Sequence, residues 1–155
     1  MKPEIKTKWL EALRSGEYTQ ADSLIQETGG QRSFCCLGVL NDISGLGEWH
    51  RGQDYICPGG EEEAFERFLA DGGHPKYWDK EQEYQYTKRE NEYAHDLVVE
   101  WAGLTDKDPK LQITSEFASR HGFVHQSKAH TANISVLNDS GVSFLALADL
   151  IEEQL

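Results

Sequence analysis

"SFCCLGVLND", residues 33–42, places two adjacent cysteines at the start of an apolar run. Adjacent side chains diverge on a helix or a strand, so we expect Cys35 and Cys36 not to be bridged to each other. A zinc site usually separates paired cysteines by two or more residues, and this run has no spacer. A nucleophilic cysteine needs a nearby base and usually an electropositive setting. We interpret both cysteines as small buried core residues on a short helix that ends at Gly45.

Length and charge limit what the rest of the chain can be. The chain has 155 residues, which predicts a single domain over residues 1–155, with 15 basic and 27 acidic residues and a net charge of −12. This balance disfavours nucleic-acid binding, which needs clustered lysine and arginine. No apolar run is long enough to cross a membrane, and the first residues lack the apolar stretch of a secretion signal. We therefore expect a cytoplasmic protein.

Apolar spacing and glycine positions predict a mostly helical α+β domain with a small β-hairpin. Helices are expected over about residues 3–15, 61–70 and 91–102, with shorter ones near 115–120 and 134–139 and a last helix capped by Ser143. Gly29 and Gly30 predict the hairpin turn, and Ser33 is a candidate cap for the helix that follows. Residues 45–60 and 104–113 are expected to be loops. A strand through Trp78, Tyr84 and Tyr86 is a further candidate.

No motif of catalysis or cofactor binding is present. His121, His125 and His130 lie close in sequence, but Gly122 interrupts the helix that would align them. Asp106 and Asp108 imitate the start of a calcium loop that lacks its glycine and its glutamate. Phosphate-loop and dinucleotide-binding patterns are absent. We therefore expect no catalytic residues, no metal and no cofactor.

Aromatic and arginine side chains form the candidate ligand-binding set. Rings can stack on a base and a guanidinium can pair with a phosphate, so such a set suits a nucleotide-like ligand. Arg14 lies at a helix end and is followed by Gly16, so Arg14, Tyr18 and Gln20 could present polar groups from one turn. The alternative is that Arg14 caps carbonyls and Tyr18 packs on Trp9. The candidates are Trp9, Arg14, Tyr18, Gln20, Arg32, Trp49, Arg51, Trp78 and, less centrally, Trp101.

Asn138 and Asp139 raise the same choice between ligand binding and structure, and we interpret them as local turn chemistry.

Three stretches together resemble a family of small phage and bacterial proteins without an assigned function: "KWLEALRSGEYTQ" (8–20), "FCCLGVLNDISG" (34–45) and "LNDSGVSFLALADLIE" (137–152), with "EWAGL" (100–104) between them. The matching segments cover about a third of the chain, in the same order as in the family. The resemblance implies a phage-associated cytoplasmic protein, and it supplies no catalytic residue that could be transferred to this chain.

Three functional hypotheses follow. The first is a non-enzymatic phage protein that counters host antiviral defence by binding and sequestering a small nucleotide-like ligand. The second is an acidic inhibitor of a host protein, which would use the carboxylates of Glu61, Glu62, Glu63, Asp79, Glu81 and Glu83. The third is a small hydrolase that would use a histidine with an aspartate or glutamate, although no such pair is recognisable in the sequence. Exposed apolar residues on the last helix would also permit a symmetric homo-oligomer.

Overall fold

The computed structural model of the chain describes residues 1–50, 54–57, 61–77, 79, 82–83, 93–122 and 130–155. It is a mostly helical α+β fold with small sheets of two or three strands, as expected. None of the described helices reaches the length and hydropathy that a bilayer crossing needs.

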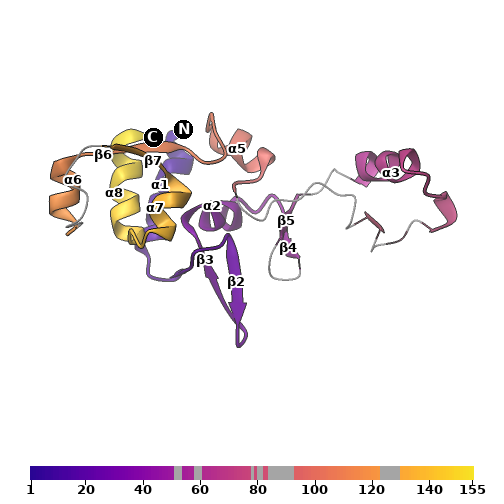
Figure 1. The fold of residues 1–155 in the computed structure, drawn as a ribbon, viewed down its shortest axis with the longest axis horizontal. Coiled ribbons are helices and arrows are strands. Elements are labelled where there is room, and N and C mark those ends of the chain that lie inside the picture. The colour runs from indigo at the N-terminus through magenta and orange to yellow at the C-terminus, as the bar shows by residue number, and fades with distance from the viewer. Residues whose placement is uncertain (51–53, 58–60, 78, 80–81, 84–92, 123–129) are drawn as a thin grey trace.

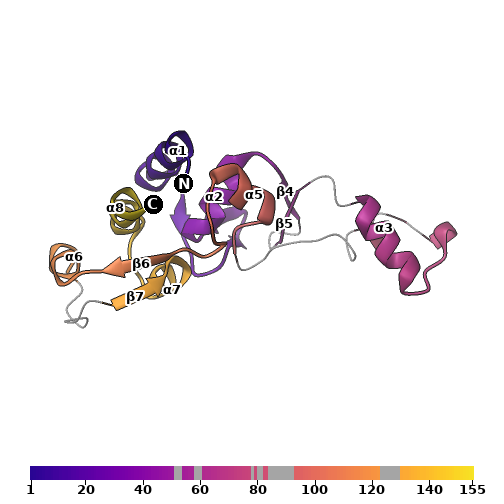
Figure 2. The ribbon, with the colours of Figure 1, turned by 90° about the horizontal axis from the view of Figure 1, so that it is seen from above.

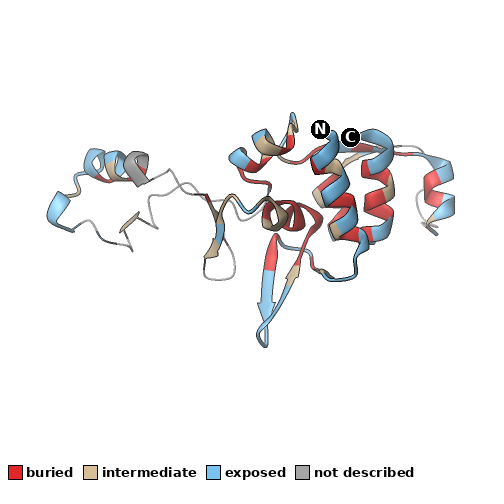
Figure 3. Cartoon of the chain, turned by 180° about the vertical axis from the view of Figure 1, so that it is seen from behind, coloured by how far each residue is buried: buried red, intermediate tan, exposed pale blue. Residues whose placement is uncertain are grey.

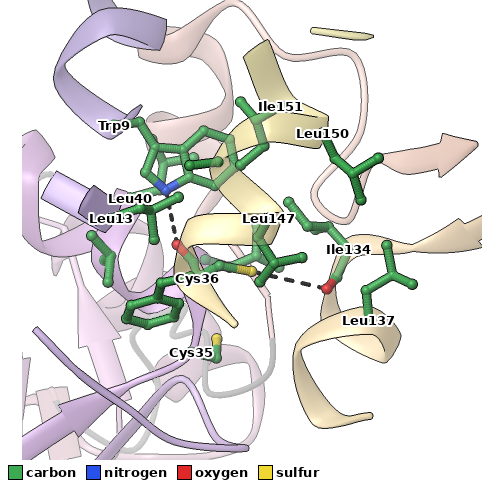
Figure 4. Packing of buried hydrophobic residues seen from close by; sticks show 14 of the residues in the cluster. Trp9, Leu13, Cys35, Cys36, Leu40, Ile134, Leu137, Leu147, Leu150 and Ile151 are labelled. Carbon is green, nitrogen blue, oxygen red and sulfur yellow. Dashed lines mark hydrogen bonds between the residues drawn. The ribbon is translucent and has the colours of Figure 1, made fainter. Parts of the chain in front are cut away.

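Three helices from distant parts of the chain form the centre of the fold. α1 (Pro3–Arg14), α2 (Cys36–Ser44) and α8 (Phe144–Gln154) contribute side chains to one buried apolar cluster. The two chain ends lie close together (Figures 1 and 2). The buried faces of α1 and α8 stand opposite each other in Figure 3. Trp9 is fully buried between them, and its indole N–H donates a 3.0 Å hydrogen bond to the carbonyl of Cys36 (Figure 4). The first helix is therefore fastened to the helix that carries both cysteines.

The predicted hairpin is present. β2 (Ile25–Thr28) pairs antiparallel with β3 (Gln31–Phe34), and a short β1 (Thr19–Gln20) pairs with β3 in parallel. Gly29 and Gly30 both have positive φ, of 62° and 79°, which a two-residue hairpin turn requires. The hairpin extends away from the core, and its tip is exposed (Figure 3).

Two segments expected to be loops contain strands. β4 (Glu48–His50) pairs with β5 (Asp54–Ile56), and β6 (Lys110–Ile113) pairs with β7 (His130–Asn133). For β4 and β5, the glycines within residues 45–60 led to the prediction of a loop. Gly47 instead allows close backbone approach, because a Cβ there would lie 2.4 Å from the Ile56 carbonyl oxygen. In the second case the partner strand lies far along the chain, so no local signal marks the pair.

The remaining helices follow the predictions except at one start. α3 (Glu61–Ala70) lies apart from the central helices in both ribbon views, and a 3₁₀ turn, η1 (Pro75–Tyr77), follows it (Figures 1 and 2). α5 (Asp96–Ala102) begins later than expected, because the His95 ring caps it by accepting from the Leu97 amide. α6 (Ser115–Arg120) and α7 (Ile134–Asp139) are present, and Ser143 caps α8 as predicted. The candidate strand through Trp78, Tyr84 and Tyr86 lies outside the described residues.

Candidate functional site

The two adjacent cysteines are buried free thiols. Cys35 exposes 3% and Cys36 none of its surface. Cys36 points toward the carbonyl of Ile134 on α7 (Figure 4). Cys35, rather than the expected Ser33, caps α2: its sulfur accepts from the Gly38 amide, while Ser33 lies on β3 and its hydroxyl donates to the Gln26 carbonyl. The interpretation of both cysteines as core residues is confirmed.

The electrostatic setting of the thiols opposes a role as nucleophiles. Burial raises the pKa of Cys35 to about 11, and it also raises the pKa of Cys36. The carboxylates of Asp108 and Asp139 add to both shifts, because negative charge nearby disfavours a thiolate. Reactive cysteines have the opposite setting, with a positive charge or a helix end that lowers the pKa. Both thiols are therefore protonated at neutral pH.

Arg14 is held by two carboxylates of α8. Its Nη2 atom lies 2.7 Å from Asp149 and 2.6 Å from Glu152. Arg14 lines an open depression of about 470 Å³ together with Thr7, Leu10, Glu11, Ser15 and Glu152, which we call the Arg14 depression. The guanidinium is thus shared between α1 and α8, and acidic groups surround it.

Trp9 and Gln20, two other members of the predicted set, have structural contacts. Trp9 is enclosed by the core and exposes none of its surface. The Gln20 amide donates to Asn138 and to the Val142 carbonyl, and its oxygen accepts from the amide of Phe144 at the start of α8. In this structure neither residue presents an unoccupied polar group to a ligand.

Tyr18 and Trp49 are brought together by a residue that the sequence reasoning missed, Asp42. The Tyr18 hydroxyl donates to one oxygen of the Asp42 carboxylate at 2.7 Å, and the Trp49 indole N–H donates to the other at 2.8 Å. Burial, followed by the bond to Asp42, raises the pKa of Tyr18. Phe34 lies between the two rings, with centroids 5.3 Å from Tyr18 and 5.7 Å from Trp49. The cluster therefore connects α2 to Tyr18, just before β1, and to Trp49 on β4.

The other predicted ligand residues are dispersed. Arg32 is on the exposed hairpin, 3.7 Å from Glu27, and Trp101 is half-buried against the core. Arg51 and Trp78 lie outside the described residues, as do Glu81 and the side chains of residues 61–63. Asp79, of the proposed acidic surface, accepts from the amide of Gln82 at 3.0 Å.

Asn138 is a core link and not the local turn residue that we expected. It lies on α7 and exposes 1% of its surface. Its oxygen accepts from the Cys36 amide and from Gln20, each at 3.2 Å, and its nitrogen donates to the Ala21 carbonyl at 2.7 Å. One side chain therefore joins α7 to the first sheet and to α2.

A repeated tetrapeptide could have identified these residues in the sequence. "VLND" occurs at residues 39–42 and again at 136–139. In both copies the asparagine is buried: Asn41 accepts from the His95 amide at 3.1 Å, as Asn138 does from Cys36. A buried amide must find hydrogen-bond partners, so asparagine inside an apolar helical stretch indicates a structural cross-link.

A second hollow opens at the N-terminus of α2. It has a volume of about 250 Å³ and is formed by the β1–β2 connection, the start of α2, the residue Tyr93 and α7. We call it the Cys35 pocket, and it is lined by Asp22, Ser23, Leu24, Cys35, Tyr93, Ser135 and Asp139. Among the residues that the structure describes, no lysine, arginine or histidine lines it. Asp22 makes no ion pair or side-chain hydrogen bond with any residue that the structure describes.

Metal-binding geometry is not found in the described part of the chain, where no three histidine, cysteine, aspartate or glutamate side chains could hold one ion. His121 follows α6 and lies 3.4 Å from Asp149, His130 begins β7, and His125 lies outside the described residues. Asp108 accepts hydrogen bonds from the amide and hydroxyl of Ser135. It therefore organises the start of α7.

Comparison with known proteins shows the family. The family described as a domain of unknown function (DUF8296) matches residues 1–155, so the chain belongs to this family. No curated protein and no solved structure matches the chain.

Proposed function

We propose that this member of the DUF8296 family is a non-enzymatic binding protein that occupies a basic surface of another protein. The observation that carries the proposal is the charge of its two described hollows. Glu11 and Glu152 face a single arginine in the Arg14 depression, and that arginine is already paired with two carboxylates. The described lining of the Cys35 pocket contains two aspartates and no lysine, arginine or histidine. Each hollow therefore favours a positively charged occupant.

The net charge of −12 also favours a positively charged partner, and it acts over longer distances than the two hollows do. An acidic surface accelerates encounter with a basic partner and repels nucleic acid and other polyanions. Because the chain resembles small phage and bacterial proteins, the partner we propose is a host protein in the bacterial cytoplasm, and its inhibition would favour the phage.

A nucleotide-like ligand receives less support from the same geometry. A phosphate approaching Arg14 would meet Asp149 and Glu152, which already neutralise the guanidinium. The Cys35 pocket, at about 250 Å³, is smaller than the roughly 300–1,000 Å³ of most small-molecule sites. A hydrolase that uses a cysteine nucleophile also receives little support, because the pKa of Cys35 is raised.

The test is affinity capture from bacterial lysate at low salt, about 50 mM, where charge interactions are screened least. Captured proteins are identified, purified and titrated against the wild-type chain. The matched control is the triple variant Glu11→Gln/Asp22→Asn/Asp139→Asn, which removes three negative charges from the two hollows. We expect a basic partner that binds the wild type, is released by about 0.5 M salt, and binds the triple variant more weakly.

Three results would contradict the proposal. They are the absence of any specific partner at low salt, a partner whose affinity is the same for the triple variant, and a partner without a basic surface. A thermal-shift screen with cyclic and linear nucleotides is run in parallel. A dose-dependent rise in melting temperature with one nucleotide would favour the ligand hypothesis instead.

A further inference from the structure

The polar groups that line the Cys35 pocket are mainly hydrogen-bond acceptors. The hydroxyl of Ser135 donates its proton to Asp108 at 2.6 Å, and that of Ser23 donates to the Ile25 carbonyl at 3.3 Å. A hydroxyl has one proton and two lone pairs, so both groups can only accept from an occupant of the pocket. The carboxylates of Asp22 and Asp139 are acceptors as well. The two serine hydroxyls therefore act as acceptors whether or not the aspartates carry a charge.

The acceptors on Asp22, Ser23, Ser135 and Asp139 favour an occupant that donates hydrogen bonds. Among protein side chains, arginine carries five N–H donors and lysine three, and neither has an acceptor. Among the described residues no three histidine, cysteine, aspartate or glutamate side chains gather in one place, which favours an organic cation as the occupant. The volume of about 250 Å³ suits one side chain more than a complete small-molecule ligand.

The positions of the acceptors favour arginine over lysine. Asp22 and Ser23 come from the β1–β2 connection, while Ser135 and Asp139 come from α7, so acceptors approach the pocket from two elements. A planar guanidinium can donate along several directions at once, whereas an ammonium acts as a compact point charge. Leu24 and Tyr93 also line the pocket, and an arginine stem and guanidinium can pack against such side chains.

We infer that the Cys35 pocket binds an arginine side chain supplied by the protein partner. This inference rests on the proposed function, and it names the part of a basic surface that this chain holds. Cys35 keeps its proton and forms the floor of the pocket, while Asp22 and Asp139 pair with the guanidinium at its mouth. Val136, which follows Ser135 on α7, exposes 54% of its surface and is available to contact the partner.

The test is a nuclear magnetic resonance titration of the ¹⁵N-labelled full chain with blocked tripeptides of the form acetyl-Gly-X-Gly-amide. X is arginine, lysine or citrulline, and citrulline is the neutral analogue that retains the shape of arginine. We expect the arginine peptide to shift the amides of Ser23, Cys35 and Ser135. The lysine peptide should bind more weakly, and the citrulline peptide should cause no saturable shift.

Variants localise the contact. Asp22→Asn and Asp139→Asn should each weaken arginine-peptide binding by about threefold to fivefold, the size expected of an exposed ion pair. The control Glu17→Gln removes an exposed charge that does not line the pocket, and it should leave the affinity unchanged. Equal binding of the citrulline or lysine peptide, shifts centred elsewhere, or unaltered affinity in both aspartate variants would overturn the inference. Tighter binding of spermidine in the same pocket would overturn the assignment to a protein side chain.

The two proposals can fail separately. A basic partner that still binds Asp22→Asn and Asp139→Asn normally would leave the proposed function standing and remove the pocket from it. Pocket-centred shifts with the arginine peptide, together with no partner in the capture experiment, would retain the pocket chemistry and remove the proposed function.

Discussion

Replacing Asn138 with alanine would remove the amide that joins three parts of the fold. The side chain accepts from the Cys36 amide and from Gln20, and it donates to the Ala21 carbonyl. Asn138 exposes 1% of its surface, so water cannot replace it without the core opening. The substitution would leave the Cys36 N–H and the Ala21 carbonyl without these partners.

The size of the effect follows from those two groups. A buried polar group that loses its partner costs about 1–3 kcal/mol, so two of them cost about 2–6 kcal/mol. Domains of this size are stable by about 5–15 kcal/mol, which makes the expected loss a large fraction of the total. Glu17→Ala, at an exposed position, is the control and should change the free energy of unfolding by less than about 0.5 kcal/mol.

The assay is urea unfolding followed by circular dichroism and tryptophan fluorescence. With a slope of about 2 kcal/mol per molar urea, the midpoint should fall by about 1–3 M. Should Asn138→Ala be too unstable to measure, Gln20→Ala tests the same link through its bonds to Val142 and Phe144. A midpoint change in Asn138→Ala no larger than that of the control would refute the claim that this amide holds the core.

Three further predictions concern α2 and its cap. Gly38→Ala places a Cβ 1.8 Å from the Leu24 carbonyl oxygen, which is backbone and cannot give way, so thermal unfolding should show a loss of about 1–3 kcal/mol or more; wild-type stability would contradict this contact. Because the pKa of Cys35 rises from 9.0 to about 11 on folding, the protonated thiol favours the folded state below pH 9, and this stability is lost as the pH rises to 11; the urea midpoint should fall over that range, and less steeply in Cys35→Ala, whereas a flat profile would disprove the shift. Asp42→Ala removes the acceptor of the Trp49 N–H and should destabilise the half-buried aromatic cluster by about 1–2 kcal/mol in the same urea assay, and an unchanged midpoint would show that water replaces the carboxylate.

Local patterns predicted most of the helices because the chemistry that starts and ends them is local. Gly45 and Gly103 adopt left-handed conformations just after α2 and α5, and Ser143 caps α8 with its own hydroxyl. The hairpin at Gly29 and Gly30 was recognisable for the same reason. These features depend on a few consecutive residues, so a sequence displays them directly.

The pairing of β6 with β7 and the lining of the Cys35 pocket could not be predicted from local sequence patterns. β6 needs β7 as its partner, and nothing near Lys110–Ile113 indicates which segment will pair with it. The Cys35 pocket unites residues 22–24, 35, 93, 135 and 139, which only the packed helices bring together. The sequence identified Arg14 as a candidate for ligand binding. It could not show that Asp149 and Glu152 would already hold Arg14.

The contact between α1 and α8 also has a consequence for how the protein is made. The ribosome releases residues 3–14 well before residues 144–154, yet Trp9 and Leu13 share one buried cluster with Leu147 and Ile151. The part of the α1 face that packs on α8 therefore stays uncovered until α8 has been synthesised. Chains that stall before Phe144 should expose this part of α1 to chaperones and proteases.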